Sequence, residues 1–281
     1  MDSTGRFDTF DGPNFTGNTL TNNVRSPIEM YVPTFDQLDA SSSFTGNGQR
    51  IKILGGTVDR SGLWQDLDED IEVVADFNVQ GVANPQLTIA DGHVFYMATG
   101  VEVYVGNSSD GSLVTAGDIA LGSGILFTSS AAVPARGDWD GLYLSSLSEG
   151  SRIEGTTVAF AGGGGNLGAI YLNSNSNYQV TTSTVTESAN HGLYSGSSTG
   201  LISGSTFVNS NNTGVYLDSP SSLTTLGTPS FANNTMSGNG GDAINVYAHD
   251  VRQLAASSAY TGNSGRVRIQ GGTAATTGTW R

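Results

Sequence analysis

One short pattern is written five times in the second half of the chain, as Gly141-Leu142-Tyr143-Leu144, Ala169-Ile170-Tyr171-Leu172, Gly192-Leu193-Tyr194, Gly214-Val215-Tyr216-Leu217 and Ala243-Ile244-Asn245-Val246. A rougher sixth copy is Arg266-Val267-Arg268-Ile269. Counted at the position of Tyr143, the steps between copies are 28, 23, 22, 29 and 23 residues. Periods of about 20–50 residues mark proteins in which one small unit is stacked on the next. The pattern therefore predicts a solenoid.

Two further sets of apolar residues recur in phase with the first. About 15 residues after each copy stands one residue of a second set: Val158, Val185, Phe207, Phe231 and Tyr260. Five residues earlier stands a third set: Ile153, Val180, Ile202, Leu226 and Ala255. Each unit thus holds three short apolar clusters separated by turn residues, which is typical of three strands per coil. A single coil cannot bury its inward side chains, so we expect an all-β parallel β-helix (β-solenoid) that forms one continuous elongated rod.

The composition excludes several classes of site and partner. The chain has 281 residues, of which 39 are Gly and only 13% are charged. Cys is absent, which excludes a thiol nucleophile, a Cys-bound zinc and any disulfide. The net charge is −14 and Lys52 is the one lysine, so we expect no nucleic-acid partner, because phosphate binding needs a basic surface. No apolar run reaches the length of about 18 residues that a membrane span needs.

A much longer repeat overlies the short ones. Residues 14–64 align without a gap on residues 230–280, and 21 of these 51 pairs are identical at a constant offset of 216. We therefore interpret residues 1–64 as the C-terminal coils of a preceding β-helix repeat and residues 65–280 as one complete repeat unit. This interpretation leads us to expect a segment of a longer tandem array, or a protomer that continues end to end with its neighbour.

Several stretches resemble those of a known group of proteins. They are Leu87-Thr88-Ile89-Ala90-Asp91-Gly92-His93-Val94-Phe95, Gly111-Ser112-Leu113-Val114, Ile125-Leu126-Phe127-Thr128-Ser129 and Gly137-Asp138-Trp139-Asp140-Gly141-Leu142. In this order they are similar to bacterial right-handed parallel β-helix repeat proteins of the cell surface or secreted fraction, with a pectin-lyase-like fold. The resemblance covers nearly the whole chain from about Asn14. It implies the right-handed fold and a surface location, but its members include lyases and adhesin segments, and fold does not fix function.

The recurring tyrosines are the strongest candidates for ligand binding. They are Tyr143, Tyr171, Tyr194 and Tyr216. Each stands between aliphatic or small neighbours, and the alternation of side chains along a strand favours outward tyrosines and inward aliphatic residues. An outward row could bind a glycan as an aromatic stripe. A stacked aromatic ladder could equally stabilise the solenoid without any ligand.

The other candidate sites are weaker. The acidic residues of 66–70 could offer oxygens to Ca²⁺, but they lack the Gly and distal Glu of a calcium loop, so we expect a solvated seam and no metal. Asp138 and Asp140 could form a carboxylate pair of the kind that cleaves sugars, with Trp139 between them turned inward. Lyases of this fold use clustered Asp with a basic residue, whereas Arg152 and Arg252 here stand over no acidic face. We expect the three histidines in turns or on the surface: His93, His191 and His249.

These observations favour a structural role. We expect a non-catalytic structural or adhesive segment of an extracellular tandem-repeat β-helix surface protein or fibre, which associates with itself end to end and uses no cofactor. The expected partners are neighbouring repeats or identical subunits head to tail, together with surface glycans. Two alternatives remain open, namely a polysaccharide-active, lyase-like enzyme and a glycan-binding β-helix module.

Overall fold

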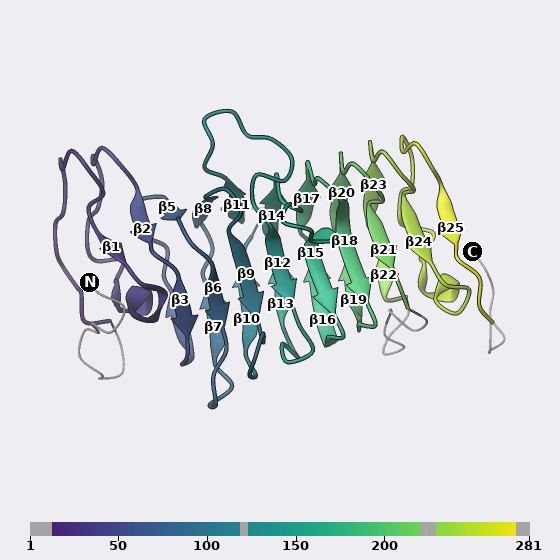
Figure 1. The fold of residues 1–281 in the computed structure, drawn as a ribbon, viewed down its shortest axis with the longest axis horizontal. Helices are drawn as coiled ribbons and strands as arrows, with labels where there is room; N and C mark the ends of the chain where they lie inside the picture. The colour runs from purple at the N-terminus through teal and green to yellow at the C-terminus, as the bar shows by residue number, and fades with distance from the viewer. Residues whose placement is uncertain (1–12, 119–122, 220–222, 224–228, 274–281) are drawn as a thin grey trace.

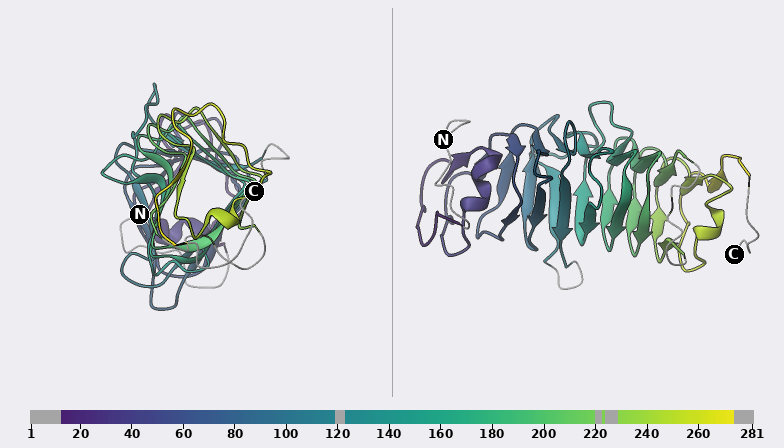
Figure 2. Two further views of the ribbon diagram at one scale, coloured as in Figure 1. Left: turned by 90° about the vertical axis from the view of Figure 1, so that its right-hand side faces the viewer. Right: turned by 90° about the horizontal axis from the view of Figure 1, so that it is seen from below.

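The computed structural model describes residues 13–118, 123–219, 223 and 229–273, which form one elongated rod (Figure 1). Short strands follow one another around a common axis, and each strand pairs in parallel with strands one turn before and after it. Seen along the axis, the coils lie one behind another (Figure 2). The expected all-β parallel β-helix is therefore confirmed.

Three parallel sheets run along the rod, and the chain visits them in the order 1, 2, 3 and then 1 again. Sheet 1 consists of β1 (Glu29–Met30), β2 (Ile51–Ile53), β5 (Ile71–Val73), β8 (Val94–Met97), β11 (Ile125–Ser129), β14 (Thr156–Ala159), β17 (Thr184–Thr186), β20 (Thr206–Val208) and β23 (Thr235–Ser237). Sheet 2 consists of β3 (Gly56–Val58), β6 (Phe77–Val79), β9 (Glu102–Val105), β12 (Gly141–Leu144), β15 (Gly168–Asn173), β18 (His191–Gly196), β21 (Val215–Leu217), β24 (Ile244–Val246) and β25 (Val267–Ile269). Sheet 3 consists of β4 (Gly62–Trp64), β7 (Gln86–Ile89), β10 (Ser112–Ala116), β13 (Arg152–Glu154), β16 (Ser176–Thr181), β19 (Thr199–Ser203) and β22 (Phe231–Ala232).

Among the described residues, helical structure is confined to two short 3₁₀ turns, η1 (Val32–Gln37) and η3 (Val251–Gln253). No helix among the described residues has the length and apolar character of a membrane span.

A continuous apolar core fills the rod. Alternate residues of the strands point inward and are almost fully buried, as Leu142 and Leu144 of β12 illustrate. Trp139 is inward as predicted, and its indole Nε1 donates a hydrogen bond to the carbonyl of Ala159 at 2.8 Å. Burial of these side chains over many coils stabilises the rod, which contains no disulfide.

Asparagines hold the corners between coils. Asn209 and Asn233 adopt left-handed backbone angles, with φ of 57° in both, which Asn tolerates better than most residues. The buried side chain of Asn239 accepts a hydrogen bond from the Ser210 amide at 2.9 Å and donates one to the Phe207 carbonyl at 3.0 Å. Side-chain amides thus replace the backbone partners that a strand ladder loses at a corner.

One assignment of the apolar sets was wrong. Phe231 was expected to follow Phe207, but it pairs with Ile202 in sheet 3. The partner of Phe207 in sheet 1 is Met236. The segment between β21 and β22 is longer than the corresponding segments of the other coils. For this reason the expected alignment assigned Phe231 to the set of Phe207 instead of the set of Ile202. Leu226, which was placed in the third set, lies outside the described residues.

Candidate functional site

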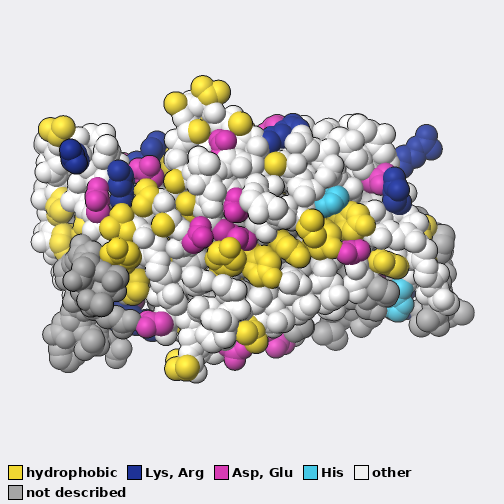
Figure 3. Space-filling model, viewed as in Figure 1, with side chains coloured by type: hydrophobic (Ala, Val, Ile, Leu, Met, Phe, Trp, Pro, Cys, Tyr) yellow, Lys and Arg dark blue, Asp and Glu magenta, His cyan; other side chains and the backbone are white. Residues whose placement is uncertain are grey.

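Five tyrosines form one row on the outer surface of sheet 2. Strand register places Tyr104, Tyr143, Tyr171, Tyr194 and Tyr216 at directly paired positions of β9, β12, β15, β18 and β21. Their neighbours in each strand point into the core, so the rings lie outside it, as predicted. We call this row the tyrosine face, and Figure 3 shows a band of hydrophobic side chains along this side of the rod.

The rings of the tyrosine face contact one another in edge-to-face, tilted and stacked pairs. Tyr171 lies 5.0 Å from Tyr143 at an interplanar angle of 83°, and 5.2 Å from Tyr194 at 90°. Tyr194 and Tyr216 are stacked at 5.4 Å and 12°. Such pairs contribute about 0.5–1.5 kcal/mol each beyond the burial of area. The row therefore stabilises the stack of coils whether or not a ligand is bound.

Polar side chains fix the phenol groups at the rim of the face. Asn173 Nδ2 donates a hydrogen bond to the Tyr143 hydroxyl at 2.7 Å. The Tyr194 hydroxyl donates to the carboxylate of Asp218. Burial, and then this carboxylate, raise the pKa of Tyr194 above its ordinary value. The Tyr194 phenol consequently stays neutral at physiological pH, and both phenol groups are held in a fixed orientation.

Three carboxylates gather at the β9 end of the tyrosine face. The amide of Glu102 donates to Asp76 Oδ1 at 2.8 Å, and Asn166 Nδ2 donates to Glu102 Oε1 at 2.7 Å. Burial raises the pKa of Glu102. Burial and the charge of Asp76 likewise raise the pKa of Asp140. The protonated form of each of these two carboxyl groups is thus favoured more than in water.

Asp138 does not share this environment with Asp140. Its Oδ2 accepts hydrogen bonds from the Ser129 hydroxyl at 2.5 Å and from the Ala135 amide at 2.8 Å. Asp138 therefore closes the loop before β12, and the carboxyl groups near Asp140 are Asp76 and Glu102 instead. The structure therefore does not support the weak candidate in which Asp138 and Asp140 form a carboxylate pair about the tryptophan.

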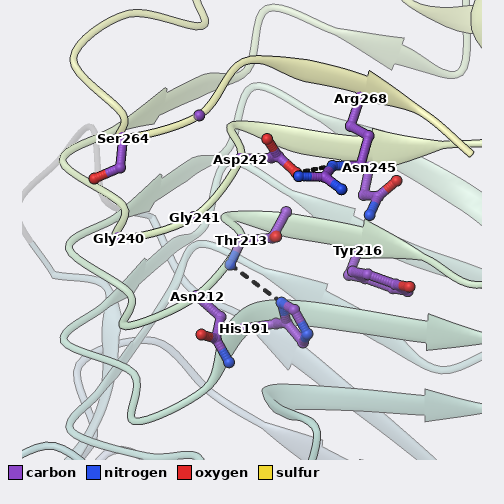
Figure 4. A pocket seen from close by; sticks show the side chains of 11 residues that line it. His191, Asn212, Thr213, Tyr216, Gly240, Gly241, Asp242, Asn245, Ser264 and Arg268 are labelled. Atoms are coloured by element: carbon purple, nitrogen blue, oxygen red, sulfur yellow. Dashed lines mark hydrogen bonds and ion pairs between the residues drawn. The ribbon is translucent and has the colours of Figure 1, made fainter.

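An open groove of about 490 Å³ lies at the other end of the face, which we call the terminal groove (Figure 4). Its walls come from four successive coils and are lined by His191, Asn212, Thr213, Tyr216, Gly240, Gly241, Asp242, Asn245, Ser264, Gly265 and Arg268. Asn245 and Arg268 continue the row of tyrosines in register, since β24 and β25 pair beyond β21. Arg268 is ion-paired with Asp242 through its Nε.

Asn245 carries the one feature of the groove that the rod does not explain. Its side chain is only 6% exposed, and its Oδ1 has no hydrogen-bond partner. A buried acceptor without a donor costs about 1–3 kcal/mol. Asn245 lines the groove beside an aromatic ring and a guanidinium group, so a small rotation of its side chain would bring this shielded acceptor to a ligand that carries hydroxyl groups.

The histidines were expected in turns or on the surface, and His249 lies in a turn as expected. His93 follows a turn but is buried, at 2% exposure, with its Nε2 3.3 Å from the Trp64 carbonyl. His191 packs against Tyr216 with 4.7 Å between ring centroids, and its Nδ1 accepts a hydrogen bond from the Thr213 amide at 3.2 Å. Burial lowers the pKa of His191 to about 4. The ring is thus neutral and part of the groove wall.

The acidic residues of 66–70 are engaged in contacts within the rod. Asp68 accepts hydrogen bonds from the Ser43 hydroxyl and the Phe44 amide, both at 2.8 Å. Asp70 lies 4.0 Å from the guanidinium of Arg50. Within the residues that the structure describes, no group of three or more His, Cys, Asp or Glu side chains could hold a metal ion.

Sequence reasoning missed Tyr104, Glu102 and the terminal groove. Tyr104 alternates with Val103 and Val105, so the strand pattern alone could have placed it outward. It was not counted among the recurring tyrosines because 39 residues separate it from Tyr143, a longer step than any between copies of the pattern. The groove had no signal in one stretch of sequence, because its residues come from separate coils.

Comparison of the chain with protein-family models, with curated proteins and with solved structures gave no match.

Proposed function

We propose that this chain is a non-catalytic structural and adhesive rod of the extracellular surface, and that the tyrosine face and terminal groove bind a glycan. The observation that carries the proposal is the unpartnered Oδ1 of Asn245 at the end of a row of outward aromatic rings. Aromatic rings supply large rigid contact areas, and a few converging polar groups fix the orientation of a ligand.

The dimensions of the face suit an extended chain. Strands repeat every ~4.8 Å along the rod, so the row of five rings covers about 20 Å. The terminal groove prolongs the row beyond Tyr216 in the same register. A linear oligosaccharide lying parallel to the rod axis would contact several rings at once and end in the groove.

The charges beside the face favour a neutral glycan. Asp76, Glu102 and Asp140 lie at one end and Asp218 lies beside Tyr194. The chain as a whole carries a net charge of −14. A polyanionic chain would be repelled along this row, while hydroxyl groups can donate to the carboxylates and to Asn245. We therefore expect neutral polysaccharides to bind better than uronic-acid or sulfated ones.

A binding panel tests the proposal. Affinity electrophoresis in gels that contain neutral or acidic polysaccharides would be run with the wild type, Tyr171→Ala, Tyr171→Phe and Asn245→Ala. Tyr96→Ala is the matched control, because Tyr96 is an outward aromatic residue of sheet 1 that packs under Arg50 at 3.5 Å. We expect about tenfold weaker binding for Tyr171→Ala and Asn245→Ala and near wild-type binding for the control. Equal retention of all variants would contradict the proposal.

One observation favours a second candidate, a polysaccharide-cleaving enzyme. Glu102 and Asp140 both have raised pKa values at the end of the aromatic row, and sugar cleavage uses one protonated and one ionised carboxyl group. Wild type and Glu102→Gln would be incubated with any polysaccharide that binds, and new reducing or unsaturated ends measured. Release that depends on Glu102 would establish the enzyme, whereas intact polysaccharide supports the non-catalytic role.

A further inference from the structure

The same coil occurs at both ends of the described chain. Glu29 pairs with Lys52 in β1 and β2, and their counterparts 216 residues later, Asn245 and Arg268, pair in β24 and β25. The isolated bridges repeat in the same way, since Phe15–Leu38 corresponds to Phe231–Leu254 and Thr19–Ser43 to Thr235–Ala259. The sequence repeat is therefore a repeat of strand pairing, residue for residue.

The two copies of this coil differ in what covers them. Ile51 and Ile53 of β2 are fully buried, at 0% exposure, because β5 of the next coil pairs with β2. Their counterparts Val267 and Ile269 of β25 are 39% and 42% exposed. Phe44 is likewise fully buried, whereas its counterpart Tyr260 is only partly buried. The later copy thus presents an apolar end face, whose earlier counterpart in the same molecule is covered by β3, β4 and β5.

The charges at the edge of this end face have also been kept. Arg50 lies 4.0 Å from Asp70, and Lys52 Nζ lies 3.8 Å from Glu72 Oε2, across the β2–β5 junction. The counterparts of the two cations are Arg266 and Arg268. A following coil with acidic residues at the positions of Asp70 and Glu72 would therefore lie beside the two cations of the end face. Asp70 and Glu72 lie beside Arg50 and Lys52 in the same way at the β2–β5 junction.

The last strands of the two copies of the coil belong to different sheets. β2 belongs to sheet 1, but its counterpart β25 belongs to sheet 2. From β2 the chain returns to sheet 1 eight times, in β5, β8, β11, β14, β17, β20, β23 and at Ala259, which bridges to Thr235 of β23. β25 follows one sheet later. The 216-residue repeat is thus eight turns and about one third of a turn, and not a whole number of turns.

We propose that the end face formed by Leu254, Tyr260, Val267 and Ile269 is a docking surface for a further copy of this chain's own repeat, whose strand equivalent to β5 pairs with β25 as β5 pairs with β2. Because β25 occupies sheet 2, the copy is rotated by one sheet about the axis. Its tyrosine face then extends sheet 3 of this chain. Successive copies display that face in three directions, and the fourth copy faces the same way as the first. The inference rests on burial and register and does not depend on glycan binding.

Disulfide trapping tests the rotation, since the chain has no native Cys. The protein is a two-copy chain, in which a second copy of residues 65–280 follows Trp280. The rotated junction predicts that Arg268→Cys forms a disulfide with Glu72→Cys of the second copy. A junction without rotation would instead bring Arg268→Cys beside Asn78→Cys of the second copy. Lys52→Cys with Glu72→Cys of the first copy is the positive control, because these residues are paired in the structure.

We expect the Arg268 and second-copy Glu72 pair to cross-link to the same extent as the control, and the Asn78 pair to less than about a tenth of it. Preferential cross-linking to the Asn78 position, or none beside a working control, would overturn the proposal. Small-angle scattering of the two-copy chain without added Cys gives a second readout. The added turns should lengthen one straight rod by about 40 Å at ~4.8 Å per turn. A bent or two-lobed particle would also overturn it.

Discussion

Acidification should weaken the rod at His191, and the effect should be separable from that of every other titrating group. His191 lies against Tyr194 and Tyr216, and its Nδ1 accepts a hydrogen bond from the Thr213 amide. Burial lowers its pKa to about 4 from an ordinary value of 6.5, although the charge of Asp218 acts weakly in the opposite direction. The charged imidazolium is thus disfavoured in the folded state.

The sign and the size follow from linkage. Between pH 6.5 and about 4 the unfolded chain binds a proton at His191 that the folded chain does not, so stability is complete above pH 6.5 and is lost as pH falls toward 4. Each unit of pKa difference corresponds to ~1.36 kcal/mol, which gives an upper bound of about 3 kcal/mol. The ring keeps some contact with solvent, so we expect a loss of about 1–2 kcal/mol.

His191→Asn isolates this contribution, because the Asn Oδ1 can accept the same hydrogen bond without titrating. Urea unfolding, followed by the fluorescence of the buried Trp64 and Trp139, would be measured for both proteins from pH 4 to 7.5. The difference in unfolding free energy between them removes the contributions of Glu102 and Asp140, which gain protons more readily when folded. A difference that stays constant with pH would refute the reasoning.

Three further substitutions have defined expectations. Asn239→Ala leaves two buried backbone groups without partners and should lower the unfolding free energy by about 2–5 kcal/mol in urea titrations, whereas Asn212→Ala on the exposed surface should change it by less than about 0.5. Gly155→Ala would place a Cβ 1.8 Å from the Gly117 carbonyl oxygen at a φ of +56°, so we expect a lower thermal midpoint or no soluble protein. Trp139→Phe removes an indole hydrogen bond and core volume, and calorimetry should show a loss of about 2–3 kcal/mol.

The sequence allowed the fold and the direction of the tyrosines to be predicted because both follow from local rules. A period of two along each strand and a repeat of 22–29 residues suffice to separate the inward Leu142 from the outward Tyr143. Turns between strands obey no such rule. Because the turns vary in length, Phe231 was assigned to the wrong apolar set, and Tyr104 was not recognised as a copy of the tyrosine pattern. Both residues nevertheless fit the strands in which they lie.

The groove could not be predicted for a different reason. His191, Asp242 and Arg268 come together only because the four successive strands β18, β21, β24 and β25 of sheet 2 stack in one register. Nothing local distinguishes Asn245 from the many other asparagines of the chain. Its unpartnered acceptor becomes visible only when every neighbour has been placed.

The tyrosine row alone cannot separate a binding role from a structural one. Its four ring pairs contribute about 2–6 kcal/mol, which is comparable to the net stability of many domains, so stability is a sufficient reason for the row. Asn245 is different, because its buried acceptor stabilises nothing that the structure describes. Asn245→Leu should therefore leave the urea midpoint unchanged or raise it, since it removes an unsatisfied polar group of similar size. The same variant should lose about tenfold or more in glycan affinity. A stable Asn245→Leu protein with the glycan affinity of the wild type would show that the acceptor binds no ligand. A destabilised protein would show that the side chain is structural.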